Sequence, residues 1–239
     1  MEKPFFNIPQ IITQVDRDKR AQDKTVEALL LRLETAMDWG IFAEEYQPEM
    51  FSQDDINVID LSVIETGRYG LRNLVLDVVC RNLFRKRTIE RRREELNLSA
   101  GFPRIWLAID EAHQFVPSSK TTLAKENLIR WVKEGRQPGL SLIAASQQPA
   151  SIDSEILSQC DVIIAHKITA LEDMQALNKL NQDYMKRELQ TLIRQIKERG
   201  IAILVDDENE SVNAVSIRPR KSHHGGSESR DSSSVRFRI

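Results

Sequence analysis

"RIWLAIDEAHQFVP" (residues 104–117) joins a continuous apolar run to two adjacent carboxylates. An uninterrupted apolar run of this length predicts a β-strand that is covered on both faces. Asp110 and Glu111 then stand at the carboxyl end of that strand. Phosphate-anhydride hydrolysis needs one carboxylate to hold Mg²⁺, usually through water, and a second to orient the attacking water. Taken alone, however, an acidic pair that merely caps the next turn explains these residues equally well.

Strands and helices alternate on both sides of this stretch. Further buried strands are predicted at 56–62, 140–145 and 161–165, and apolar residues at helical spacing predict helices over 71–83, 128–135 and 185–196. The runs 201–205 and 212–217 flank the acidic turn "DDENES" and predict a C-terminal hairpin. The expected fold is therefore α/β, with a mainly parallel sheet and helices on both faces. Ligands of such sheets bind at the carboxyl ends of the strands.

The two ends of the chain have a different composition. Residues 1 to about 20 are predicted to be polar and irregular, and a helical stripe from Val26 to Met37 ends near Gly40. We expect a helical segment over 1–55, an ATPase-like core over 56–220 and a flexible Ser/Gly-rich tail over 221–239. The charge run "RKRTIERRREE" (85–95) is predicted to be a solvated helix end, with polyphosphate binding as the weaker alternative.

Composition excludes several classes of protein. The 239 residues are 41% hydrophobic and 29% charged, as expected of a globular protein, and the net charge of −2 confines any polyanion site to a local patch. Cys80 and Cys160 lie in apolar contexts and are predicted to be reduced, buried thiols. There is no signal-peptide core and no apolar run near the ~18 residues that span a bilayer. These features predict a cytoplasmic protein without a membrane contact.

Two further polar stretches follow the acidic pair. "KEGRQPG" (133–139) places Arg136 on a glycine-bounded connection, where a guanidinium would stabilise charge on a transferred phosphoryl group. Ser146 and Gln147 follow the strand 140–145 at its carboxyl end. An amide at that position would hydrogen-bond the γ-phosphate or the attacking water. Each feature alone is an ordinary loop residue, but their order along an alternating α/β pattern favours a nucleotide site.

The combination "IWLAIDEAHQFVP" with "KEGRQPGLSLIAASQQPASIDSEILSQCDVIIAHKI" resembles the HerA branch of the HerA/FtsK translocase ATPases, over roughly residues 56–217. The resemblance implies a RecA-like core that uses ATP and Mg²⁺, assembled as a homohexameric ring on double-stranded DNA. It also implies DNA-end processing with a NurA-type nuclease. Asp110 and Glu111 match the Walker B pair, with Asp110 holding Mg²⁺ through water. Arg136 matches the arginine finger supplied in trans, and Gln147, beside Ser146, matches the polar sensor.

A phosphate-binding loop of the form Gly-x-x-x-x-Gly-Lys-Ser/Thr does not occur in the 239 residues; "GRYGLRN" (67–73) lacks both the spacing and the lysine. In the family this loop lies upstream, on a central strand between those corresponding to 140–145 and 161–165. We therefore expect the C-terminal part of a longer ATPase, with an incomplete sheet and no hydrolysis by itself. The missing segment would come from the same or another chain, or the fragment would repack; a normal five-stranded RecA order would contradict this expectation.

Two alternatives stay open. A non-catalytic or split subunit would complete a ring and supply Arg136 to the neighbouring site. A fragment of a DEAH-box helicase is a weaker alternative, because such helicases carry a second RecA-like domain and a Ser-Ala-Thr motif. DNA contacts would be sequence-independent and salt-sensitive. Arg68 and Lys120, on loops near strand ends, are weak candidates for them.

Overall fold

A computed structural model describes residues 6–18, 20, 22–42, 51–53, 55–64, 70–98, 101–180, 189, 191–194, 196, 198, 200–219 and 221. The chain divides into two compact units, Met1–Ile59 and Asp60–Ile239. The predicted tail over 221–239 lies outside the described residues except for Lys221. None of the described helices is long and apolar enough to cross a membrane.

The first unit contains two helices, α1 (Ile8–Arg17) and α2 (Asp23–Met37). The α2 helix confirms the predicted stripe. The prediction of an irregular start was wrong, because α1 begins there with a capping box: Asn7 Oδ1 accepts from the Gln10 N–H at 3.0 Å, and Gln10 Oε1 accepts from the Asn7 N–H at 3.2 Å. This reciprocal bonding satisfies two N–H groups that a helix start otherwise leaves unpaired.

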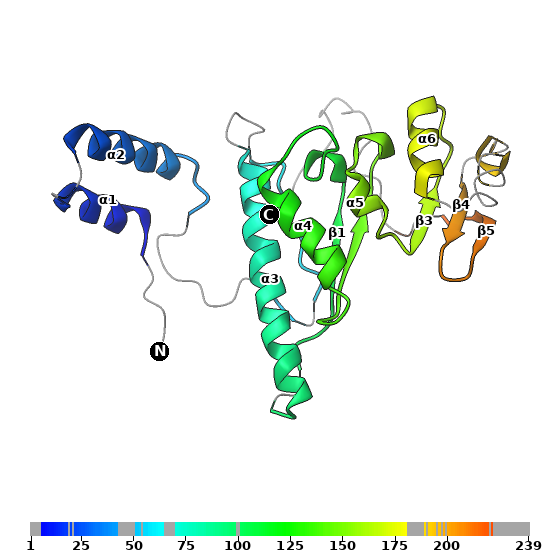
Figure 1. The fold of residues 1–239 in the computed structure, drawn as a ribbon, viewed down its shortest axis with the longest axis horizontal. Coiled ribbons are helices and arrows are strands. Elements are labelled where there is room, and N and C mark those ends of the chain that lie inside the picture. Colours follow the sequence, from blue (N-terminus) through cyan, green and yellow to red (C-terminus); the bar gives the residue numbers. More distant parts are fainter. Residues whose placement is uncertain are drawn as a thin grey trace, which may run out of the picture. The chain divides into compact units, whose positions relative to one another are not determined.

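Two long helices cover the first sheet of the second unit: α3 (Leu71–Glu95) and α4 (Leu123–Glu134) (Figure 1). The side chains of Cys80, Leu128 and Trp131 between them are fully buried. Burial, and to a lesser degree the Asp77 charge, raises the pKa of Cys80 to about 12, so this thiol is unreactive near neutral pH. Cys160 is half-buried, and neither cysteine is in a disulfide.

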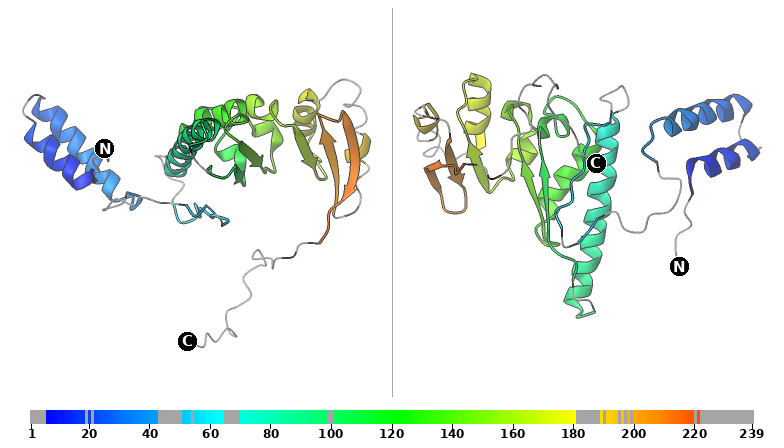
Figure 2. Two further views of the ribbon diagram at one scale, coloured as in Figure 1. Left: turned by 90° about the horizontal axis from the view of Figure 1, so that it is seen from below. Right: turned by 180° about the vertical axis from the view of Figure 1, so that it is seen from behind.

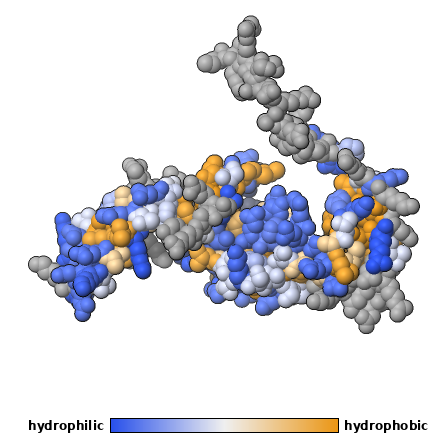
Figure 3. All heavy atoms as spheres, turned by 90° about the horizontal axis from the view of Figure 1, so that it is seen from above, coloured by the Kyte–Doolittle hydropathy of each residue, from blue (hydrophilic) through white to orange (hydrophobic). Residues whose placement is uncertain are grey.

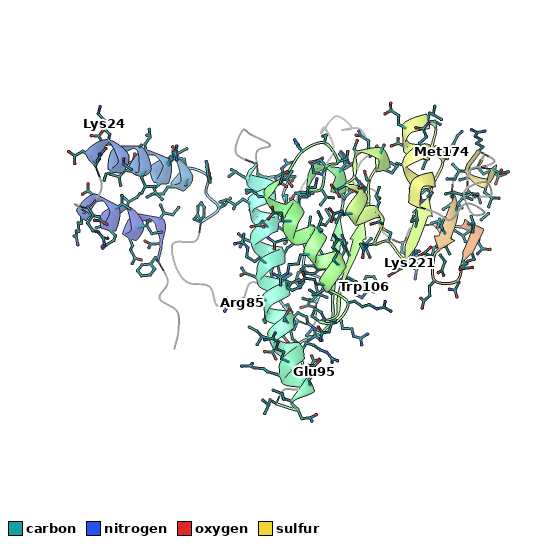
Figure 4. The ribbon with its side chains drawn as sticks, viewed as in Figure 1. Lys24, Arg85, Glu95, Trp106, Met174 and Lys221 are labelled. Atoms are coloured by element: carbon teal, nitrogen blue, oxygen red, sulfur yellow. The ribbon has the colours of Figure 1, made fainter. Side chains whose placement is uncertain are left out.

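The charge run at 85–95 continues α3, as predicted, but it is not wholly solvated. Arg85 points away from the core (Figure 4), whereas the Arg87 side chain is 5% exposed and pairs with Glu94 at 2.7 Å. Arg87 lies on the arc of the helix that faces the core, about one turn after buried Phe84. The burial of Arg87 therefore follows from its position on the helix and could not be predicted from the charge of the run alone.

The first sheet pairs β1 (Ile105–Ile109) with β2 (Leu140–Ala144) in parallel, with Ile105 opposite Leu140 and Ile109 opposite Ala144. Both strands were predicted. Figure 2 shows α3 and α4 on the same side of this sheet. On the other side Trp106 is 69% exposed and Ile143 is 51% exposed, and Figure 4 shows Trp106 beside β1.

The second sheet has the order β3-β4-β5 and is antiparallel throughout, with β3 (Val162–Ala165), β4 (Ile201–Asp206) and β5 (Ser211–Ser216). The predicted C-terminal hairpin is thus confirmed. A separate core packs against this sheet and includes residues of α6 (Leu171–Leu180) and the buried Leu189, Ile193 and Ile196. The last three lie in the stripe predicted over 185–196, of which six of the twelve residues are described.

Three expectations need correction. Among the described strands the pairing is not mainly parallel, because β1–β2 is a parallel pair while the β3–β4–β5 ladder is antiparallel. The helices described around β1–β2 cover one face, as the exposure of Trp106 shows. Residues 56–60 form no strand, and Ile56 and Val58 are 94% and 84% exposed. Their β-branched side chains favour extended backbone, but a strand exists only where a partner completes its hydrogen bonds.

Candidate nucleotide-hydrolysis site

Two loops run side by side at the carboxyl ends of β1 and β2. The strand ladder continues into them, since the Ala145 N–H donates to Ile109 O and the Ala112 N–H donates to Ala145 O, both at 2.9 Å. Farther along, the Asp153 N–H donates to Val116 O at 2.8 Å. Figure 1 shows this edge at the upper end of the sheet, near α5 (Ser154–Leu157), and Figure 3, which views the molecule from above, shows mainly hydrophilic residues in the middle of that surface.

Apolar and charged contacts fix the first loop. Ala112, on the short 3₁₀ turn η1 (Ala112–Gln114), is 1% exposed, and Val116 is 2% exposed. Lys125 of α4 pairs with Asp153 at 2.7 Å and donates to Pro117 O at 2.8 Å. Burial raises the pKa of Asp153, but hydrogen bonds from Lys125 and from the Glu155 N–H outweigh it, and the resulting pKa lies below the usual range. These contacts hold the backbone of the loop that carries its polar residues.

The two carboxylates lie where the strand pattern predicted. Asp110 is exposed, and its Oδ1 accepts from the Glu111 N–H at 2.9 Å. Glu111 has φ 49° and ψ 46°, a left-handed conformation that costs a non-glycine residue roughly 1–2 kcal/mol. Such a conformation persists only where surrounding contacts impose it. It turns the Glu111 side chain toward the loop after β2.

Glu111 meets the second loop through Gln147. Gln147 Nε2 donates to Glu111 Oε1 at 3.0 Å. Ser146 lies beside this pair, and its Oγ accepts from the Gln148 N–H at 3.0 Å. The structure therefore brings together Glu111, Ser146 and Gln147, which the sequence placed at two separate strand ends.

His113 also belongs to this group, although it was not among the residues predicted from the sequence. Its Nδ1 lies 3.0 Å from Ser146 Oγ and 3.4 Å from Glu111 Oε2, and its side chain is 20% exposed. The one signal in the sequence was its position in "DEAH", two residues after Glu111. Nothing in the sequence indicated that a residue of the loop after β2 would lie against it.

Arg136 lies at the opposite end of the sheet. Its turn joins α4 to β2, and the neighbouring Gly139 O accepts from the Ile105 N–H at 3.0 Å, where β1 begins. Five residues of strand separate the two ends, which is about 16 Å. The Arg136 side chain is exposed and makes no hydrogen bond or ion pair within the described part of the chain. It is therefore not brought together with the carboxylates of its own chain.

A close-packed base supports the Arg136 turn. Gly135 leaves no room for a Cβ, which would lie 2.1 Å from Trp131 O. Gly139 has φ 82°, and a Cβ there would lie 3.0 Å from Arg104 Cγ and 3.6 Å from a terminal nitrogen of Arg87. The Arg87–Glu94 pair, in which the Arg87 side chain is buried, thus lies next to the Gly139 position of the turn.

The weak DNA candidates have different outcomes. Lys120 is exposed on the segment that leads into α4, at the same edge as Asp110, and its carbonyl accepts from Lys125 Nζ at 3.2 Å. Arg68 lies outside the described residues. For Mg²⁺, the exposed Asp110 carboxylate suits a hard cation that keeps most of its water. The described residues hold no cluster of three or more His, Cys, Asp or Glu side chains, so a cage built from this chain alone is not found there.

The chain is similar in sequence to known helicases. It is 26% identical over 176 residues to a probable helicase of Methanocaldococcus jannaschii, covering 70% of this chain and 33% of the relative. It is 31% identical over 153 residues to the DNA double-strand break repair helicase HerA of Saccharolobus solfataricus, covering 56% and 30%. With HerA of Pyrococcus furiosus it shares 25% over 175 residues, covering 63% and 30%. The chain is HerA-like, which confirms the resemblance of its motifs.

The extent of these matches is limited. The chain spans about a third of the length of the curated relatives it matches. No family model matches it. Among solved structures, the genome packaging NTPase B204 of Sulfolobus turreted icosahedral virus 2, in complex with ATP-gammaS, has a TM-score of 0.42 and 18% identity, covering 49% of this chain and 54% of that chain.

Proposed function

We propose that this chain carries the hydrolysis half of an ATP site in a HerA-type DNA translocase. Asp110 would hold Mg²⁺ through water, Glu111 would orient and deprotonate the attacking water, and Gln147 would sense the γ-phosphate with Ser146 beside it. The observation that carries the proposal is the 3.0 Å bond from Gln147 Nε2 to Glu111 Oε1. It joins an acid and an amide from neighbouring parallel strands, where such sheets bind ligands.

Arg136 would serve the neighbouring subunit. Its distance from the carboxylates of its own chain, about 16 Å by strand length, excludes one nucleotide from using both. A head-to-tail contact between copies would bring the Arg136 end of one sheet to the carboxylate end of the next. Repeated contacts of this kind close into a ring, and we propose a hexamer.

The phosphate-binding loop would come from a segment outside these 239 residues, in the same or another chain. Its strand would fit between β2 and β3, which are not paired with each other in the described structure. Two open strand edges at that place favour an inserted strand, because unpaired backbone groups in a covered sheet are costly. Without that segment we expect this chain to hydrolyse no ATP.

Double-stranded DNA is the proposed substrate of the ring. Two of the three relatives named above are DNA double-strand break repair helicases. By analogy we propose a role in DNA-end processing, with a NurA-type nuclease as the partner. Lys120 is a candidate for a contact to the DNA backbone, because it is an exposed cation on a loop at a sheet end. The names of the relatives favour this assignment over a DEAH-box helicase fragment.

One alternative has an observation in its favour. The 239 residues contain no Gly-x-x-x-x-Gly-Lys-Ser/Thr sequence. A non-catalytic subunit that only supplies Arg136 to its neighbour would lack this motif too. The two functions differ in which residue matters. In a non-catalytic subunit the Arg136→Ala substitution would lower the activity of the ring, whereas Glu111→Gln would not.

The test is DNA-stimulated ATP hydrolysis by the assembled ATPase that contains this chain. We expect Glu111→Gln to lower kcat by roughly 10²–10⁴-fold, the usual contribution of a general base. Glu126→Gln is the matched control, because Glu126 is an exposed glutamate in the first turn of α4 and should leave kcat unchanged. An undiminished rate in Glu111→Gln would refute the catalytic role and leave the non-catalytic alternative.

A further inference from the structure

His113 links the two loops of the candidate site. Its Nδ1 lies 3.0 Å from Ser146 Oγ on the loop after β2, and 3.4 Å from Glu111 Oε2 on its own loop. On its other oxygen Glu111 accepts from Gln147 Nε2 at 3.0 Å. Side-chain contacts therefore run from Gln147 through Glu111 and His113 to Ser146, and the backbone between Ser146 and Gln147 closes the circuit.

The hydrogen-bond inventory of Ser146 assigns a direction to this circuit. Ser146 Oγ accepts from the Gln148 N–H at 3.0 Å, and its second lone pair is available to accept from His113 Nδ1. In the tautomer that carries its proton on Nδ1, His113 donates to Ser146 Oγ and presents the same N–H toward Glu111 Oε2, whereas an unprotonated Nδ1 would place a lone pair against the carboxylate. The same serine thus accepts from the backbone of the Gln147 loop and from His113.

The fold itself does not need this histidine. Its turn is anchored by Ala112, which is 1% exposed, and by Phe115, which is 6% exposed. The loop after β2 is held independently by the bond from the Ala112 N–H to Ala145 O. A half-buried polar ring between two anchored loops adds little packing, so its polar contacts are what it contributes.

We propose that His113 is a positioning residue, which fixes Glu111 and the Gln147 loop relative to each other through Ser146. When Gln147 turns to a γ-phosphate it gives up Glu111 Oε1, and His113 keeps the carboxylate in place for the water. This rests on the proposed role of Glu111 in hydrolysis. In this arrangement Glu111 and Gln147 respond to the nucleotide as one unit.

The first test compares His113→Ala with His113→Asn in the assembled ATPase. Removing an outer partner of a reacting group commonly costs about 10–100-fold. We expect that loss in kcat for His113→Ala, with the KM for ATP changed less than about twofold. His113→Asn places an amide atom near the position of Nδ1 and should recover most of the rate. His166→Ala is the matched control, because His166 is exposed and its Nδ1 lies 3.3 Å from Ile201 O, on the second sheet.

The second test uses the chain by itself and needs no hydrolysis. Amide hydrogen exchange over 145–148 should be faster in His113→Ala than in the wild type, with the same thermal midpoint, and His113→Asn should restore protection. Unchanged exchange there, or an unchanged kcat in His113→Ala, would overturn the proposal. Should Glu111→Gln also leave kcat unchanged, the proposed function fails instead, and the exchange result still decides whether His113 couples the two loops.

Discussion

Where β1 and β2 end, the Glu111 side chain contacts those of Gln147 and His113, and His113 contacts Ser146. Where both strands begin, by contrast, Arg136 stands exposed on a turn that is packed on its inner side. The first end consists of exchangeable hydrogen bonds on anchored loops. The second consists of close backbone contacts beside the Arg87–Glu94 pair, with little freedom to rearrange.

This difference indicates which part of ATP hydrolysis each end would serve. Groups that handle water and protons must change partners during hydrolysis, and the carboxylate end has such partners within 3.4 Å. An arginine that reaches into another subunit needs a fixed base instead, because preorganised charge stabilises a transition state best. Each experiment below alters one end and leaves the other as its reference.

The largest effect is expected from Arg136→Ala. An arginine finger contributes roughly 10³–10⁵ to kcat, and the assembled ATPase should lose that factor. Gln137→Ala, at the exposed neighbour on the same turn, is the control and should keep its rate. The chain itself should stay folded, because the Arg136 side chain makes no hydrogen bond or ion pair within the described residues.

Mixing makes this test specific for action between subunits. An assembly of Arg136→Ala chains and Glu111→Gln chains contains some sites with an intact Glu111 from one chain and an intact Arg136 from the next. Part of the activity should therefore return, although each variant alone is inactive. If no mixture recovers activity, the two ends do not meet across an interface.

The next largest effect concerns stability. Arg87→Met removes one partner of a pair in which the Arg87 side chain is 5% exposed. Breaking such a pair is strongly destabilising, and we expect the thermal midpoint to fall by roughly 5–10 °C. Hydrogen exchange should accelerate over 135–139 more than over 145–148, because the pair lies next to the Arg136 turn. Arg92→Met, at an exposed position of the same helix, should change the midpoint by no more than about 1 °C; an equal loss in both variants would contradict the supporting role of Arg87.

The sequence predicts a strand correctly only where an apolar run also has a neighbouring strand with which it can pair. The runs 104–109 and 56–62 look alike as sequence, yet the first is paired with β2 and the second is not a strand. A residue pattern indicates which backbone conformation a segment favours, whereas strand pairing depends on which other segment lies beside it. The α1 helix differs, because its start is indicated locally by the Asn7–Gln10 capping box and not by the polar composition of residues 1–20.

The positions of the candidate site residues were predicted from the sequence, but the contacts between their side chains were not. Strand ends located Asp110, Glu111 and Gln147, because parallel strands finish at a common edge. The bond between Glu111 and Gln147 and the place of His113 depend on the register of β1 against β2 and on the left-handed backbone at Glu111. Neither is encoded in a residue type, so neither was available before the structure.

A smaller effect is expected from Gln147→Ala at the carboxylate end. It removes a hydrogen bond to a charged group, which commonly contributes about 1.5–3 kcal/mol, and kcat should fall by roughly 10–100-fold. Gln148→Ala is the control, because the Gln148 backbone, not its amide, contacts Ser146. If Gln147→Ala lowers only the affinity for ATP and leaves kcat unchanged, Gln147 binds nucleotide without acting on Glu111.

The smallest effect tests the base of the carboxylate end through pH. The pKa of Asp153 lies below its usual range, because the hydrogen bonds from Lys125 and the Glu155 N–H outweigh burial. A lowered pKa in the folded state gives stability that is present above the unfolded value, near 3.9, and is lost as pH falls through the folded value. Asp153→Asn keeps an oxygen for the Glu155 N–H but loses the charge facing Lys125, so its thermal midpoint at pH 7 should lie roughly 2–4 °C below that of the wild type. The two midpoints should converge as the pH falls through the folded-state pKa of Asp153, because the wild-type carboxyl is then protonated and uncharged. A difference that persists unchanged at low pH would mean that shape, and not the charge paired with Lys125, anchors the loop beneath Glu111.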